Sequence, residues 1–159
     1  PNGILVTHLS FFDADSNGLA EDHMVGLWDS AGNLLASSAI SAGTVDALDA
    51  TGKFRARAIT PVLLAAGTNY TVGGTFNAGS GDSQAINVTG LTMGTGITYG
   101  EARVANNGLS TLTMPTTGGF GFNGLPGGSF NFQAVPEPGT MIALGAGLLA
   151  VARRRRSSK

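Results

Sequence analysis

The stretch Lys53-Phe54-Arg55-Ala56-Arg57-Ala58-Ile59 decides the fold class. Basic and apolar side chains alternate along it, which puts the three bases on one face and the apolar residues on the other. An alternation with period two is the mark of a half-buried β-strand, because successive side chains of a strand point to opposite faces. The sequence therefore predicts a strand here.

Similar patterns recur on both sides of this stretch. Residues 4–12 are apolar on both faces, which predicts a central strand, and Ser30-Ala31-Gly32 is a turn-like link between two strands of a hairpin. The predicted strands besides the first are residues 4–12, 24–29, 33–40 and 69–76 and, with a weaker pattern, 84–89, 97–104 and 129–133.

Short strands separated by glycine-rich turns predict an all-β fold, an antiparallel and jelly-roll-like β-sandwich over residues 1–134. The chain of 159 residues contains 25 glycines, 42% apolar and 12% charged residues. This composition excludes a helical bundle, which would be rich in charged helix formers, and a disordered chain, which would be poor in apolar residues.

The charge is distributed unevenly along the chain. Residues 1–152 hold four bases and all ten acids, so their net charge is 4 − 10 = −6, whereas the last seven residues hold five bases. A body this acidic lacks the basic surface that nucleic-acid binding needs. The absence of cysteine excludes a disulfide framework and a thiolate metal site.

The tail, residues 135–159, has three parts. Pro136-Glu137-Pro138 is a stiff spacer, an apolar run follows to Ala152, and four arginines close it. The run from Thr140 to Ala152 has thirteen residues, against about 20 for a full membrane span. A short C-terminal hydrophobic helix is expected, either inserted in a membrane or docked on the body.

This order of parts resembles the PEP-CTERM sorting signal of Gram-negative bacteria. The resemblance implies that an exosortase in the inner membrane recognises Pro136, Glu137 and Pro138 and removes the tail. It implies export, transient anchoring, and release to the cell surface or extracellular matrix, with an N-terminal signal peptide before Pro1. The implied membrane segment includes Met141, Ile142, Leu144, Leu148, Leu149 and Val151, and the implied cytoplasmic stop is Arg153, Arg154, Arg155 and Arg156.

The body resembles an uncharacterised β-sandwich family of exported bacterial proteins between Ile4 and Phe76. The segments that carry this resemblance are residues 13–19, 23–29, 32–37, 59–62 and 66–70. The resemblance implies a fold and an exported location. It implies no activity, because none is established for the family. It also implies a further strand before Pro1.

The segment from Asp13 to Gly18 is the sharpest local signal for chemistry. Oxygen-bearing side chains at alternate positions followed by glycine are typical of calcium loops, but Met24 stands where the closing acid belongs. The predicted calcium ligands are Asp13, Asp15, Asn17, the Leu19 carbonyl and Glu21. The alternative is a polar loop in which Asp and Asn form turns with the backbone.

No other pattern predicts a catalytic site. His8 and His23 are the only histidines, too few for a zinc site without several carboxylates, so both are expected as hydrogen-bonded strand residues. No G-x-S-x-G elbow is present, and an enzyme is not expected.

The aromatic residues leave two functions open. Trp28, with Tyr70 and Tyr99, is either a platform for sugars or, as we favour, a core residue. The second aromatic group lies among glycines and is expected to expose some side chains as an assembly surface: Phe120, Phe122, Phe130 and Phe132. The expected function is display, adhesion or self-association into oligomers or filaments. The alternative is a carbohydrate-binding module, with or without calcium, associated with exopolysaccharide.

Overall fold

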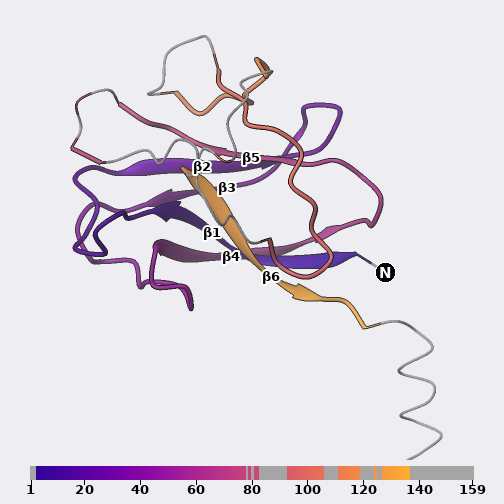
Figure 1. The fold of residues 1–159 in the computed structure, drawn as a ribbon, viewed down its shortest axis with the longest axis horizontal. Helices are drawn as coiled ribbons and strands as arrows, with labels where there is room; N and C mark the ends of the chain where they lie inside the picture. Colours follow the sequence, from indigo (N-terminus) through magenta and orange to yellow (C-terminus); the bar gives the residue numbers. More distant parts are fainter. Residues whose placement is uncertain are drawn as a thin grey trace, which may run out of the picture.

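The computed structural model describes residues 3–77, 79, 81–82, 93–105, 111–118, 124 and 127–136. They form a β-sandwich of two three-stranded antiparallel sheets (Figure 1). The strands are β1 (Ile4–Phe12), β2 (His23–Trp28), β3 (Leu34–Ile40), β4 (Phe54–Leu64), β5 (Thr71–Gly74) and β6 (Gly128–Ala134). The predicted fold class is therefore confirmed, while the predicted helix after residue 140 lies outside the described residues.

The two sheets have the strand orders β4-β1-β6 and β3-β2-β5. β1 is central, as its apolar faces predict, and pairs with β4 on one side and with β6 on the other. The hairpin between β2 and β3 is also confirmed. Asp29 closes its turn by accepting hydrogen bonds from the Ala31 and Asn33 amides, and Gly32 takes the positive φ of 89° that the turn requires.

The hydrophobic core lies between the sheets. Its fully buried members are Val6, Leu9, Phe11, Leu19, Val25, Leu27, Ile40 and Leu64. Phe11 is the largest of them and stacks on the His23 ring, with ring centroids 3.7 Å apart. Gly74 makes room for it, since a Cβ there would lie 2.9 Å from the Phe11 ring. The small residue thus sets how closely the two sheets pack.

β4 alternates as predicted, but its basic face points inward. Arg55 pairs with Phe11 and Arg57 with Leu9 in the β1–β4 register, so these side chains share the core-facing side of the sheet. Arg55 is only 5% exposed, whereas Ala58 on the opposite face is exposed. Buried carboxylates explain the reversal, because each arginine has one as its partner.

The glycine-rich second half of the chain contains less strand than predicted. Residues 97–104 do not form a strand, and Val104 makes only an isolated bridge with Thr117. Residues 129–133 do lie in a strand, β6, whereas the predicted strand 84–89 falls outside the described residues.

Trp28 is buried, as expected, but it is not part of the core between the sheets. Its ring lies over the outward-facing Gly26, where a Cβ would come within 2.5 Å of Trp28 Cη2. Pro115 covers the neighbouring Gly73, leaving the indole residue 4% exposed. Trp28 therefore belongs to a second, smaller apolar cluster on the outer face of the β3-β2-β5 sheet.

The two ends of the sandwich differ in the segments that they carry (Figure 1). One end, here called the acid-rich end, contains the loops 13–22 and 41–53 together with residues 75–77 and 81–82. The other, here called the tail end, contains Gly3, the turn 29–33, the loop 65–70 and residues 135–136. Strand direction alone decides which segments meet at each end.

Candidate functional site

The sorting motif leaves the body directly from the edge strand β6. Ala134 is the last residue of β6 and pairs with Ile4, the first residue of β1. The Val135 amide then donates a hydrogen bond to the Gly3 carbonyl at 3.3 Å. No flexible linker separates the sheet from the start of the tail. Of the predicted recognition residues, Pro136 follows at once, while Glu137 and Pro138 lie outside the described residues, as do the predicted membrane segment and arginine cluster.

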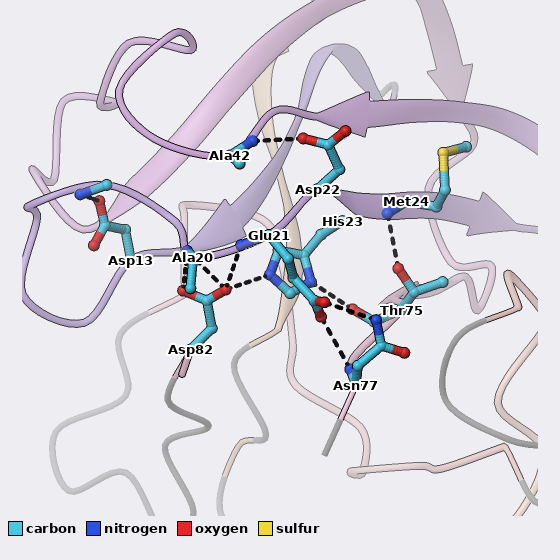
Figure 2. A network of polar contacts seen from close by, with 11 residues as sticks. Asp13, Ala20, Glu21, Asp22, His23, Met24, Ala42, Thr75, Asn77 and Asp82 are labelled. Carbon is cyan, nitrogen blue, oxygen red and sulfur yellow. Dashed lines mark hydrogen bonds and ion pairs between the residues drawn. The ribbon is translucent and has the colours of Figure 1, made fainter. Parts of the chain in front are cut away.

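A polar network around the buried His23 holds the segments of the acid-rich end together (Figure 2). His23 is fully buried at the start of β2, with Nδ1 2.8 Å from the Thr75 carbonyl and Nε2 2.9 Å from Asp82 Oδ2. Asp82 also accepts hydrogen bonds from the amides of Ala20 and Glu21. One carboxylate thereby ties the loop before β2 to the chain beyond β5.

The hydrogen-bond partners restrict how His23 carries its protons. A carbonyl oxygen only accepts, so Nδ1 must donate to Thr75. Nε2 lies within hydrogen-bond distance of Asp82, which also accepts from the Ala20 and Glu21 amides. Such a histidine is held from both sides, beneath the Phe11 ring, and fits the predicted role of a hydrogen-bonded strand residue.

A second polar cluster holds the loops around the start of β4. Arg55 Nε donates to Asp13 Oδ2 at 2.8 Å, and its other nitrogens donate to the carbonyls of Asp46 and Ser16. Arg57 forms the neighbouring ion pair with Asp46, which also accepts a hydrogen bond from the Ser41 amide. These interactions satisfy buried charges that would otherwise be costly.

The predicted calcium ligands have other partners at three of five positions. Asp13 Oδ2 accepts from Arg55 and the Gly18 amide, the Leu19 carbonyl accepts from Gly43, and Glu21 accepts from Asn77. Asp15 and Asn17 are exposed. Within the described part of the chain, no three His, Cys, Asp or Glu side chains are grouped to hold a metal ion. Calcium binding stays a prediction, which melting with and without chelator tests.

The remaining candidate residues are dispersed over the fold. His8 lies in the middle of β1 with Nδ1 3.0 Å from the Thr7 hydroxyl, away from the loops of either end. Tyr70 and Tyr99 use their hydroxyls to accept hydrogen bonds from the Ala65 and Gly124 amides. The buried Trp28 does not join them in an exposed platform.

Phe130 and Phe132, two of the four phenylalanines expected to form an assembly surface, are half-buried in β6. They pair with Leu9 and Val6 in the β1–β6 register and pack against the core from its rim. Gly94 lies against the Phe132 ring, where a Cβ would come within 2.6 Å. Phe120 and Phe122 lie outside the described residues.

Sequence reasoning missed three residues that organise the acid-rich end: Asp46, Arg55 and Asp82. Asp82 lies 59 positions from its partner His23, and no local pattern connects the two. The one usable signal was the pair of arginines in β4, because charges at alternate positions of a strand that packs on a core need acidic partners.

The tail end is organised by backbone and neutral groups, with one carboxylate. The pKa of Asp29 lies below its usual value because the Asn33 side-chain amide, and then backbone amides of the same turn, donate hydrogen bonds to the charged form. Elsewhere, the Tyr70 hydroxyl closes the loop after β4 by accepting from Ala65 at 2.9 Å.

Among the described residues, no helix is long and apolar enough to cross a membrane; the apolar run after residue 140 is not among them. A shallow cleft of about 90 Å³ lies where β5 approaches β6, lined by glycine backbone, Thr75, Arg103 and Pro115. Arg103 in this cleft is paired with Glu101. The cleft holds no grouping of nucleophile, base and charge partner of the kind that catalysis uses.

Comparisons with known proteins divide the chain in the same way. A family model described as a domain of unknown function (DUF4082) matches residues 2–121, and one described as the PEP-CTERM protein-sorting motif matches residues 134–156. No curated protein and no solved structure gives a significant match.

The sorting motif implies recognition by an exosortase, transient membrane anchoring, and export to the surface or the extracellular space. The DUF4082 match covers most of the body, and the motif begins at the last residue of β6. The chain is therefore a member of the DUF4082 family that carries a C-terminal PEP-CTERM sorting motif.

Proposed function

We propose that the body of this exported protein acts at the cell surface or in the extracellular matrix without catalysis, by display, adhesion and self-association. The groups best suited to chemistry are used to hold the fold together. His23 is bonded through both ring nitrogens, and Arg55 is bonded to a carboxylate and two carbonyls. Side chains bound in this way are poor candidates for acting on a substrate.

The observation that carries self-association is the edge strand β3. Its sequence, LLASSAI, contains neither a charged residue nor proline. β3 ends the β3-β2-β5 sheet, and no strand of the described chain lies beyond it. Leu34 and Leu35 at its start are 50% and 36% exposed. An edge without charge, proline or cover readily accepts a strand from a second copy.

β4 provides the contrast within the same molecule. It is also an edge strand, but its second half contains Pro61, and its first half exchanges backbone hydrogen bonds with residues 47–49. These are two of the devices by which natural sheets block edge pairing. We therefore propose β3, and not β4 or the phenylalanines of β6, as the associating edge.

Sedimentation of the exported, processed protein over a wide concentration range tests the proposal. The unmodified protein and the Leu63→Lys variant, which changes an exposed leucine of β4, should associate as the concentration rises. Leu35→Lys, which places a charge on β3, should shift association to much higher concentration. An unmodified protein that stays monomeric throughout, or an equal effect of both substitutions, would contradict the proposal.

The carbohydrate-binding alternative receives no comparable support. Its proposed platform needs an accessible Trp28 ring, and Trp28 is 4% exposed beside Pro115. Binding to exopolysaccharide that Trp28→Ala abolishes, in a variant that still folds, would revive this alternative.

A further inference from the structure

We infer that the tail end of the sandwich is a lipid-facing surface: while the chain is anchored, this end lies against the phospholipid headgroups and the acid-rich end points away from them. The inference goes beyond the proposed function. It rests on membrane anchoring through the sorting tail and does not depend on self-association.

The first argument is the short connection between the fold and the tail. The backbone is held in the sheet up to Val135, whose amide is bonded to Gly3. The apolar run begins at Met141, so only residues 135–140 separate the sheet from it. Six extended residues span at most about 20 Å. β1, with nine residues, places the acid-rich end about 30 Å farther away.

The second argument is the distribution of charge. Seven carboxyl groups lie at the acid-rich end, with three bases in or next to its loops: Asp13, Asp15, Glu21, Asp22, Asp46, Asp49 and Asp82 against Lys53, Arg55 and Arg57. Arg55 and Arg57 already form ion pairs with Asp13 and Asp46. The tail end carries Asp29 as its one charged side chain among the segments that define it. Anionic lipids repel the first end far more than the second.

The third argument is that the tail end exposes leucines among uncharged residues, whereas the exposed Val45 of the acid-rich end lies among carboxylates. Leu63, near the end of β4, is 61% exposed, and Leu34, at the start of the neighbouring β3, is 50% exposed. The loop between β4 and β5, Ala65-Ala66-Gly67-Thr68-Asn69, is uncharged and exposed. Small and apolar side chains next to a membrane tether lose little on approaching headgroups, and leucine gains from partial insertion.

The chain has no cysteine, which allows a clean test by single labels. Thr68→Cys places a label on the tail end, and Thr44→Cys makes the matched change at an exposed position of the acid-rich end. The full chain is reconstituted in vesicles of phosphatidylethanolamine and phosphatidylglycerol that contain a headgroup-quencher lipid. We expect the Thr68 label to be quenched several-fold more than the Thr44 label.

Further variants separate the causes. Leu63→Ser should reduce quenching at Thr68, because it removes the most exposed leucine of the surface. Equal quenching of the two labels, stronger quenching at Thr44, or no quenching in chains that float with the vesicles would overturn the inference. Chains that do not float at all would overturn the anchoring on which it rests. Failure of the lipid-facing surface would leave the sedimentation result on β3 unaffected, so the two proposals can fail separately.

Discussion

The two ends of the sandwich are built on different physical principles. At the acid-rich end, long loops are held by buried charges: Arg55 with Asp13, and His23 with Asp82. At the tail end, short loops are held by backbone and neutral groups, such as the Tyr70 hydroxyl, and the two ends of the described chain meet there as Gly3 and Val135. We expect the first end to need its buried ion pairs to fold, whereas the second relies on neutral groups and the single carboxylate of Asp29.

This difference indicates how the chain divides its tasks. Charge is placed where loops must be ordered over the core, away from the sorting tail. The tail leaves from the end at which Asp29 is the one charged side chain of the defining segments, and we expect its recognition and removal to leave the sheets undisturbed. Variants at the two ends should therefore have very different effects on stability.

The largest effect is expected from Arg55→Met. The substitution leaves the Asp13 carboxylate, 3% exposed, without its cation and should lower the free energy of unfolding by about 3–5 kcal/mol. Urea denaturation measures the change. The control is Arg103→Met, which removes an exposed pair with Glu101 and should cost less than about 1 kcal/mol. Equal losses would refute the idea that buried charge holds the acid-rich end.

Asp82→Ala is expected to have the second-largest effect. It removes the acceptor for His23 Nε2 and for the Ala20 and Glu21 amides, and should cost about 2 kcal/mol. Asp22→Ala is the matched control, since exposed Asp22 accepts a hydrogen bond from Ala42 and should cost less than about 1 kcal/mol. Thermal unfolding of both variants checks the difference; if Asp22 proves the costlier loss, the network is not centred on His23.

Much of this architecture was accessible from the sequence. A run that is apolar on both faces located β1, and alternation located β2, β3, β5 and the first half of β4, because a strand with one face on a core must keep a period of two. Which face of β4 points toward the core could not be predicted from the sequence. Its arginines point inward because Asp13 and Asp46 receive them, and only the folded chain shows that these carboxylates lie there. The link between His23 and Asp82 was hidden for the same reason.

In the glycine-rich half of the chain, alternation predicted a strand that does not form. Residues 97–104 alternate well enough to suggest a strand, but make one isolated bridge. Several glycines instead allow a close approach: at Gly94 the Phe132 ring, and at Gly128 the backbone of Gly73, occupies the space of a missing Cβ. The alternation of apolar and polar residues cannot predict such contacts, because glycine has no side chain that contributes to it.

At the tail end, Tyr70→Phe should have a small effect. The loss of one hydroxyl that accepts from the partly exposed Ala65 amide should cost about 1 kcal/mol, with the β-signature in circular dichroism unchanged. Chemical denaturation provides the measurement. A cost of more than about 3 kcal/mol would mean that this end is held as firmly as the acid-rich end.

The smallest effect is expected from deletion of residues 135–159. The Val135 amide ties the tail to Gly3 by a terminal hydrogen bond of 3.3 Å, which by itself contributes about 1 kcal/mol, and we expect the rest of the tail to add little to stability. Thermal unfolding tests this expectation. A deletion that begins at Gly128 provides the contrast, since it removes β6 and should unfold the body. Unfolding by the shorter deletion would show instead that the tail packs onto the sandwich.

We expect the body to fold independently of a sorting tail that is later removed. The most direct test is to identify the C-terminus of the protein recovered from the cell surface. Peptide mass spectrometry should find β6 intact through Ala134 and no peptide from the apolar run or from Arg153–Lys159. Replacement of Pro136, Glu137 and Pro138 by alanine should leave the full tail in the membrane fraction. Surface protein that still carries Arg153 to Lys159, or that has lost β6, would contradict the account.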